Sequence, residues 1–428
     1  MTYEQALQKI HSLDKFGSRP GLDRIKKLFD ILGDNLLDQK FIHVAGTNGK
    51  GSTCQMICRV LTECGYKTGL FISPYITDFC ERIQINNEMI SHDLLTDAVE
   101  HLFPILKDLN SQGIIITEFE FLTALSFYIF KQQKCDIIVC ETGLGGLLDS
   151  TNLITKPLCS VLTKIDLDHT AILGDTIQLI TQQKCGIIKD NSITITAHQD
   201  DTALDIIKQT AKAKNNELYF ASEVDFSNTS LSLDTTQFCY NDTAISMHLC
   251  GEHQLDNAKT AICTLNALKE NGIIDFCTDD LVKGFVKAQN PARFEKLCKS
   301  PVVVLDGAHN VNGITAFKNA TQTFIKQKRA LLIGMLKDKD IENSLSVIED
   351  MFEVVFVTDI DNPRNMDCYE LADICKKYFK KIVVISNPKT AFDTAFDIAK
   401  ENDYALCICG SLYLAGELRP HIVEKVKS

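Results

Sequence analysis

The segment of residues 41–52, which reads FIHVAGTNGKGS, constrains the fold of this chain more than any other. Five mainly apolar residues predict a short buried strand, a glycine-rich turn follows, and residues 53–64 have helical spacing. Such a turn directs backbone N–H groups and a helix N-terminus at one point, and Lys50 adds a positive charge for phosphate. The match to the strict phosphate-loop pattern is incomplete, because Val44 replaces its first glycine and a glycine follows the lysine. We interpret the segment as a nucleotide-phosphate site.

Composition narrows the class of protein. The 428 residues are enough for two or three domains, and 45% apolar with 23% charged residues is ordinary for a globular chain. Acidic residues outnumber basic ones by 56 to 44, which argues against a nucleic-acid surface. No apolar run approaches the ~20 residues of a membrane span and no signal-peptide core is visible, so we expect a cytoplasmic protein without a membrane partner. The 17 cysteines include no C-x-x-C pair, which favours buried thiols over metal or disulfide roles.

Two further strands of the first half end in polar residues. Residues 67–72 and 135–140 have the apolar content of buried strands, and they lead into Ser73 and Glu141. Ligands bind at the carboxyl ends of strands in doubly wound sheets, so Glu141 would face the phosphate loop and could hold Mg²⁺. Two plainer roles stay open, because Ser73 could cap a turn and Glu141 could pair with a surface lysine.

The strand predicted at residues 157–163 leads into a segment with two interpretations. The sequence TKID at residues 163–166 resembles the guanine-selecting motif of GTPases, which would make the protein a GTP-dependent switch. Alternatively, His169 is a metal ligand beside Glu141, although a lone histidine is more often a plain polar contact. From the residues alone, Lys184 is expected to be a solvated helix lysine.

The second half predicts another doubly wound sheet. Short antiparallel strands are expected within residues 227–249, and apolar strands alternate with helices after residue 302. Polar residues again follow the strands, namely Asp306, His309 and Ser411, and Arg293 lies in a predicted hinge. We expect an α/β protein with a larger N-terminal domain (1–290), a hinge (291–300) and a smaller C-terminal domain (301–428), and an active site between the domains.

Ten motifs along the chain together resemble one known family. In order they read GTNGKGS, SPY followed by ERI, TEFEFLT, ETGLGG-x-LDSTN, LDHTAILG, QKCGIIK, NPARFE, DGAHN, GMLKDKD and CGSLYLAGE. They are similar to the bifunctional dihydrofolate synthase/folylpolyglutamate synthase family, a branch of the Mur-type ATP-dependent amide ligases. The resemblance implies a P-loop, mostly parallel N-terminal sheet and a Rossmann-like C-terminal domain. It also implies that ATP phosphorylates a carboxylate of dihydropteroate or a folate, and that the amino group of L-glutamate attacks the acyl phosphate.

The resemblance further implies which residues bind ATP and metal. The phosphates of ATP would be wrapped by Thr47, Asn48, Gly49, Lys50, Gly51 and Ser52. Asn257 would contact adenine, and Arg293 and Asp306 would reach ATP from the hinge and the second domain. One Mg²⁺ would be held by Ser73 and Glu141. A second Mg²⁺ would be held by His169 and by Lys184 after its carboxylation by CO₂.

Other residues fall on substrate-binding segments of the family. His309 and Ser411 would lie near the incoming glutamate and the acyl phosphate, and His309 is therefore also a catalytic candidate. The segments expected to bind pterin contain Pro20, Gly21, Leu22, Asp23, Thr117, Phe119, Glu120, Leu148, Asp149 and Ser150.

The chain departs from the family pattern near these sites. Leu147 and Ser150 stand where the family's GGRLDATN has arginine and alanine, which leaves open a folylpolyglutamate synthase without dihydropteroate activity. Asn290 and Ala292 differ in the hinge motif. Gln183 replaces a glutamate before Lys184, which removes a possible support for that lysine.

Two rival functions are less well supported. A Mur ligase of peptidoglycan synthesis would need an extra N-terminal domain of about 100 residues. Only about forty residues precede the phosphate loop. A GTP-dependent switch would have no use for a second sheet bearing DGAHN. No patch in the sequence suggests an obligate interface, so we expect a monomer.

Overall fold

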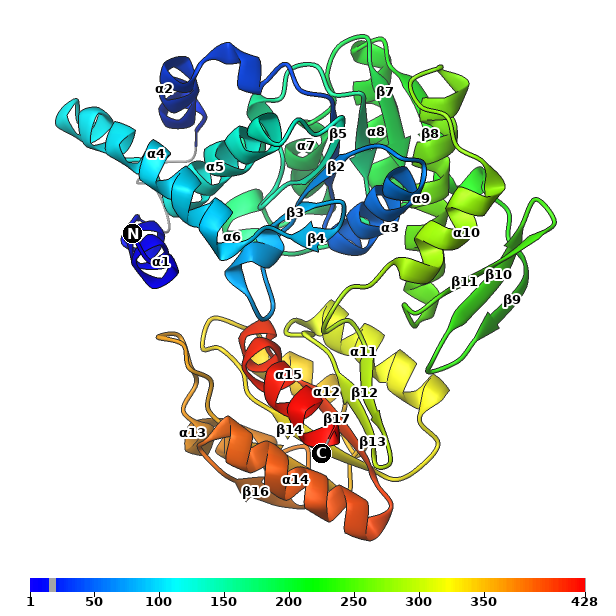
Figure 1. Cartoon of the computed structure of the whole chain (residues 1–428). Helices are drawn as coiled ribbons and strands as arrows, with labels where there is room; N and C mark the ends of the chain where they lie inside the picture. Colours follow the sequence, from blue (N-terminus) through cyan, green and yellow to red (C-terminus); the bar gives the residue numbers. More distant parts are fainter. Residues whose placement is uncertain (15–20, 428) are drawn as a thin grey trace.

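The computed structural model describes residues 1–14 and 21–427, which build two α/β halves, one above the other in Figure 1. The upper half holds an eight-stranded sheet that is parallel except for β3 and β4 at one edge. In spatial order its strands are β4 (Glu88–Met89), β3 (Ile83–Ile85), β2 (Thr68–Phe71), β5 (Ile137–Glu141), β1 (Phe41–Ala45), β6 (Cys159–Leu162), β7 (Ile193–Thr196) and β8 (Glu217–Phe220).

Helices cover both faces of this sheet because its strands are apolar on both sides. Alternate residues of β1 show this division, since Ile42 and Val44 pack on one face while Phe41 and Ala45 pack on the other. The first face is covered by α3 (Lys50–Glu63), α9 (Glu252–Glu270) and α10 (Thr278–Lys287). The opposite face is covered by α1 (Tyr3–His11), α2 (Asp23–Leu32), α4 (His92–Ser111), α5 (Glu118–Gln132), α7 (Ile177–Cys185) and α8 (Asp201–Ala213).

Short elements complete the upper half. The antiparallel strands expected within residues 227–249 are confirmed as β9 (Ser227–Leu231), β10 (Thr236–Tyr240) and β11 (Thr243–Met247). The single-turn helices are α6 (Thr170–Leu173), η1 (Asp34–Leu36), η2 (Phe79–Arg82), η3 (Ser150–Leu153) and η4 (Ala221–Glu223).

The lower half holds a six-stranded sheet with helices on both faces. In spatial order its strands are β12 (Glu295–Lys299), β13 (Val302–Leu305), β17 (Ala405–Cys409), β14 (Arg329–Ile333), β15 (Val354–Val357) and β16 (Ile382–Val384). One apolar core joins the sheet to α11 (Val311–Phe324), α12 (Ile341–Val347) and α13 (Cys368–Cys375). The other core joins it to α14 (Pro388–Asn402) and α15 (Leu412–Lys427).

The expected α/β class and its parallel sheets are confirmed, and the differences lie at the sheet edges. Strand β12 pairs antiparallel with β13, although its residues fall inside the segment expected to be a hinge. Its sequence EKLCK is half polar and its residues are only partly buried, so it lacks the apolar run that marks a central strand. The hairpin β3–β4 and the long helix α4 were not predicted either. Among residues 1–14 and 21–427, no helix combines the length and apolar character needed to cross a membrane.

Candidate active site

A cleft of about 1070 Å³ lies between the two halves. Its upper wall is formed by the phosphate loop and the ends of β2, β5 and β6, and its lower wall by the ends of β13 and β17. All of the residues expected to bind ATP or glutamate line it, together with Ser73, Glu141 and His169. The structure therefore brings together polar residues that lie more than 300 positions apart in the chain.

The phosphate loop is shaped by the segment that follows β6. The backbone N–H groups of Thr47 and Asn48 donate to the carbonyl of Lys164 at 2.8 and 3.1 Å, and the Asn48 amide donates to the Asp166 carboxylate at 3.1 Å. Asp166 is thus used to fix the loop, which gives the TKID sequence a structural role. These contacts fix the start of a loop whose residues 47–52 line the cleft.

Gly49 is required by the path of this loop. Its φ of 86° lies in the left-handed region, where side chains cost about 1–2 kcal/mol. A Cβ at this position would also collide with the amide of Asn257, which is buried on α9 and donates to Gln254 at 3.0 Å. The glycine lets α9 approach the loop, so Asn257 reaches the cleft directly beside the phosphate site.

Lys50 and Glu141 form the charged centre of the upper wall. The Lys50 amine donates to the carbonyls of Gly46 and Thr47 at 3.0 and 3.3 Å and lies 3.9 Å from a Glu141 oxygen. The other Glu141 oxygen accepts the Ser73 N–H at 3.1 Å. Burial raises the pKa of Glu141, while Lys50 and this N–H oppose the rise. A buried carboxylate at the edge of a phosphate loop is a suitable ligand for Mg²⁺.

Lys184 is buried, so the expectation of a solvated lysine is wrong. Only 4% of the residue is exposed, and its amine donates to the Gly46 carbonyl at 2.8 Å from behind the phosphate loop. Burial, with a smaller contribution from the nearby Lys50, lowers the pKa of Lys184 to about 7. Its helix α7 is held against the sheet by apolar contacts, which carry the lysine inward. Lys184 can therefore be a neutral amine near pH 7.

His169 lies on the cleft wall at the start of α6. Its φ of 48° is left-handed, and its ring nitrogen lies 3.9 Å from an Asp168 oxygen. Burial lowers the pKa of His169, and the cations that lower it further are Lys339, Lys50 and Lys184. The histidine is thus a neutral ring in the same electrostatic environment as Lys184, and its backbone N–H and its ring nitrogen contact Asp168 and not Glu141 among the described residues.

The lower wall presents a second set of groups. Asp306 follows β13, and its two oxygens accept the N–H groups of Phe294 and Ala308, each at 2.7 Å. Burial raises the pKa of Asp306 to about 6, while the nearby Arg293 opposes the rise. His309 lies three residues further on, with a ring nitrogen 2.8 Å from the Gly307 carbonyl. Ser411 accepts the N–H of Tyr413 at 3.1 Å at the beginning of α15.

Of the expected pterin segments, Glu118 lines the cleft, whereas the described residues among 21–23, 117, 119, 120 and 148–150 do not. Thr117 and Glu120 form the N-terminal capping box of α5, and Glu120 also pairs with Arg24 at 2.9 Å. Asp149 is buried and caps η3 through Thr151, and the Ser150 hydroxyl lies 2.6 Å from that of Thr123. The remaining described members are the part-buried Gly21, Leu22 and Phe119, and the exposed Asp23 and Leu148. Pro20 lies outside the described residues.

Several cleft residues were not predicted. Tyr75 and Arg82 contribute to the upper wall, and Lys339 and Tyr413 to the lower wall. Arg82 belongs to the ERI motif, so the motif was noted while its role was not. The sequence could have indicated this role, because the arginine follows a predicted strand that ends at the ligand-binding edge of the sheet.

Two family models and several known proteins match most of the chain. The Mur ligase middle domain matches residues 44–265, and the Mur ligase glutamate ligase domain matches residues 292–412. The dihydrofolate synthase/folylpolyglutamate synthase of Bacillus subtilis is 35% identical, over 98% of this chain and 99% of its own. The crystal structure of folylpolyglutamate synthase from Thermotoga maritima superposes with a TM-score of 0.87 at 32% identity, covering 99% of this chain and 97% of that one.

A further solved structure is E. coli FolC in complex with DHPP and ADP. It superposes with a TM-score of 0.85 at 26% identity and covers 100% of this chain and 99% of its own. The resemblance drawn from the ten motifs is confirmed by these matches.

Proposed function

The chain belongs to the Mur ligase family, in its dihydrofolate synthase/folylpolyglutamate synthase branch, and we propose that it uses ATP to join L-glutamate to dihydropteroate and to reduced folates. The observation that carries this proposal is the cleft, in which a phosphate loop faces an acid, a histidine and a serine from the second sheet. A relative of the same fold has been solved in complex with DHPP and ADP, and ADP is the product of phosphoryl transfer from ATP.

The reaction requires two steps that the cleft can support. An oxygen of the acceptor carboxylate attacks the γ-phosphorus of ATP, so that an acyl phosphate forms and ADP leaves. The amino group of glutamate then attacks the acyl carbon, loses a proton, and expels inorganic phosphate as the amide forms. Phosphoryl transfer depends mainly on positioning and charge neutralisation. Lys50 and the loop N–H groups supply positive charge on one wall, and the opposite wall can position the amino acid.

We assign the remaining roles by position in the cleft. Residues 47–52 surround the phosphates, Asn257 lies where the adenine would extend, and Arg293 and Asp306 approach from the second half. His309 and Ser411 face the acyl phosphate and the incoming glutamate. The pterin would bind between the cleft and the residues beside it, in the N-terminal domain (1–290). The segment 291–300 would join this domain to the C-terminal domain (301–428).

Magnesium sites suit two groups of residues. Ser73 and Glu141 would hold one ion, since this carboxylate is buried at the phosphate loop and Lys50 is the one cation within 4 Å of it among the described residues. His169 and a carboxylated Lys184 would hold a second. Bound Mg²⁺ neutralises phosphate charge during transfer. Unmodified Lys184 is a hydrogen-bond donor to Gly46 and cannot be a ligand, whereas its lowered pKa favours the neutral amine that reacts with CO₂ to give a carbamate and a proton.

Lys184→Ala is expected to lower activity by at least about 10- to 100-fold, because loss of a group that only supports a metal ligand already costs this much and the variant lacks a proposed ligand itself. Acetate or another short carboxylate should restore part of the activity, because it can replace an anionic oxygen. Carboxylation of the wild type should increase between pH 6 and 8 as the amine with a pKa of about 7 loses its proton. A carbamate signal in ¹³C NMR under ¹³CO₂ checks this without an activity assay.

Lys189→Ala is the matched control. Lys189 is also part-buried and its pKa is lowered to about 8, but its amine donates to Asn152 away from the loop. Acetate should not affect this variant. Equal activity of Lys184→Ala with and without carboxylate, together with no carbamate signal, would contradict the role of Lys184.

The proposal places the enzyme in the cytoplasm as a monomer. All 17 cysteines are free thiols, which suits a reducing compartment.

A narrower alternative is a folylpolyglutamate synthase that does not accept dihydropteroate. Release of phosphate from ATP in the presence of L-glutamate distinguishes them, with dihydropteroate and tetrahydrofolate tested separately. Release with both acceptors supports the bifunctional enzyme, tetrahydrofolate alone supports the narrower one, and release with neither contradicts the proposal.

A further inference from the structure

Arg82 is a part-buried cation on the upper wall of the cleft that no carboxylate of the described residues pairs with. Its guanidinium lies over the rings of Tyr75 and Phe79, at 5.1 and 5.6 Å from their centroids. Its Nε is buried and has no hydrogen-bond partner. Buried donors without partners are unfavourable, so one that belongs to a residue of the cleft wall is a candidate for a bond to a ligand.

The same wall of the cleft also holds a carboxylate oxygen that has no hydrogen-bond partner. Glu118, the first residue of α5, also lines the cleft, and its Oε2 is buried without a hydrogen-bond partner. Its other oxygen lies 3.5 Å from a ring nitrogen of His11. Glu118 is the strongest electrostatic neighbour of Arg82, yet the two side chains do not meet. The wall thus presents a donor and an acceptor that a ligand could satisfy together.

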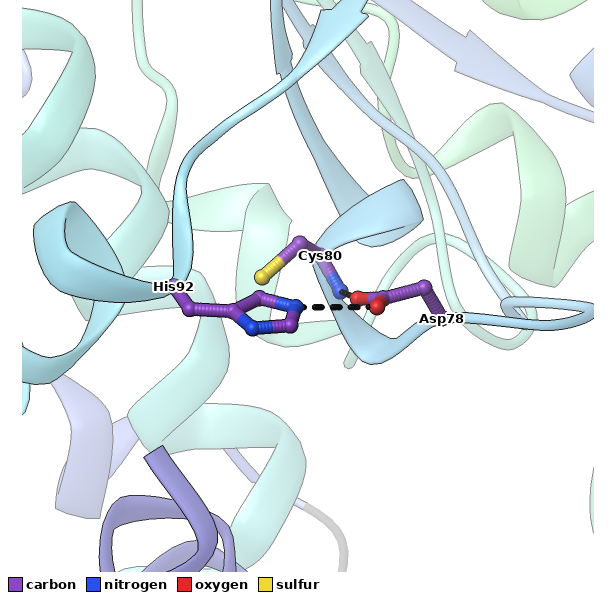
Figure 2. Close-up of side chains that lie close together, drawn as sticks. All are labelled: Asp78, Cys80 and His92. Atoms are coloured by element: carbon purple, nitrogen blue, oxygen red, sulfur yellow. Dashed lines mark hydrogen bonds and ion pairs between the residues drawn. The ribbon is translucent and has the colours of Figure 1, made fainter. Parts of the chain in front are cut away.

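The segment that carries Arg82 is held rigidly. The carboxylate of Glu81 accepts three successive N–H groups, from Ile76, Thr77 and Asp78, at 2.6, 3.0 and 3.1 Å. Figure 2 shows Asp78, Cys80 and the ring of His92 facing one another, with the Asp78–His92 contact at 2.9 Å. His92 begins α4 and stacks on Tyr3, so this cluster fastens the segment to two helices. Arg82 is therefore preorganised.

The same segment extends from the upper half to α15 in Figure 1. Ile76 packs against the apolar core of the lower half, and its carbonyl lies against Gly416. Tyr413 and Glu141 are further electrostatic neighbours of Arg82. Arg82 thus has electrostatic neighbours both in the expected pterin segment, at Glu118, and beside the phosphate loop, at Glu141, and all three line the cleft. We expect a substrate that extends from the pterin segment to the phosphate loop to come close to Arg82.

We propose that Arg82 is a specificity-determining residue that binds the free carboxylate of the terminal glutamate of a folate acceptor, while Glu118 accepts the N–H of the adjoining amide. This inference rests on the proposed function. A folate acceptor carries two carboxylates, of which one is phosphorylated and the other stays charged. Dihydropteroate has a single carboxylate, and that one reacts. Guanidinium and carboxylate form strong paired hydrogen bonds, so Arg82 favours folates over dihydropteroate.

Arg82→Gln tests this inference through acceptor selectivity. The variant should raise KM and Kd for tetrahydrofolate by about tenfold or more, the effect of losing a hydrogen bond to a charged group. The values for dihydropteroate and the KM for L-glutamate should change by less than about threefold, because neither ligand uses the guanidinium. Kd is measured by calorimetry, so dihydropteroate can be compared even if it is not turned over.

Two other variants are controls. Arg82→Lys keeps the charge and should restore part of the affinity for tetrahydrofolate, which also covers the case in which the glutamine variant does not fold. Arg59→Gln changes a part-buried arginine outside the cleft whose Nε also lacks a partner, and it should leave every constant unchanged. Equal losses for both acceptors, a change confined to L-glutamate, or no change would each overturn the inference. Failure of the wild type to bind or use either acceptor would instead overturn the proposed function.

Discussion

Lys50→Ala is expected to lower acceptor-dependent phosphate release by about two to three orders of magnitude, the usual cost of removing one donor that stabilises a transition state. The Lys50 amine is held by the carbonyls of Gly46 and Thr47 and lies beside Glu141 at the centre of the upper wall. Alanine removes the only full positive charge of residues 46–52. Charge developing on the transferred phosphoryl group would then be poorly neutralised.

Lys40→Ala is the matched control, because Lys40 is an exposed lysine just before β1, at the opposite end of the strand that leads into the loop. Initial rates at saturating ATP, glutamate and tetrahydrofolate compare the two variants. Urea unfolding checks that Lys50→Ala remains folded, since Glu141 loses a cationic neighbour. Wild-type rates in a folded Lys50→Ala protein would contradict the phosphate-loop assignment.

Glu141→Gln is expected to raise the Mg²⁺ concentration for half-maximal activity by about tenfold or more. Glutamine keeps the volume of the side chain and an oxygen that accepts the Ser73 N–H, but it removes the negative charge. Burial disfavours that charge, as the raised pKa of Glu141 indicates, so the variant should fold at least as stably as the wild type. A loss of activity would then reflect the metal and not the fold.

The pH dependence gives this prediction a second readout. A raised pKa means that Glu141 binds a proton at a higher pH than an exposed glutamate, so the Mg²⁺ affinity of the wild type should fall as the pH is lowered. Glu141→Gln should lack this dependence. Asp136→Asn is the control, because Asp136 is exposed just before the same strand and accepts the Lys67 N–H. Unchanged Mg²⁺ dependence in Glu141→Gln would contradict the metal assignment.

The parts of the site that the sequence predicted are those set by local pattern. A glycine turn after an apolar run places Lys50 at the start of a helix, and buried strands leave Glu141 and Asp306 at their carboxyl ends. The carboxyl ends of parallel strands lie at one edge of their sheet, so Lys50 and Glu141 were expected together at one edge and Asp306 at the edge of the second sheet. The order of ten motifs then assigned the family.

Features that depend on tertiary packing were not predictable in this way. Lys184 has the sequence context of a surface lysine, and only the packing of α7 against the sheet buries it. Strand β12 is half polar and pairs because β13 presents an open edge. Asp149 looked available for substrate, yet its oxygens accept from Leu144 and Thr151. The exposure of Arg82 to the cleft depends on how Glu81 folds the preceding segment.

The most direct test of the central claim follows an oxygen atom from acceptor to phosphate. Tetrahydrofolate labelled with ¹⁸O in its reacting carboxylate is incubated with ATP, Mg²⁺ and L-glutamate, and the products are analysed by mass spectrometry. Activation through an acyl phosphate predicts one ¹⁸O in the released phosphate and an acceptor longer by one glutamyl residue. Unlabelled phosphate, or phosphate released without a lengthened acceptor, would contradict the account.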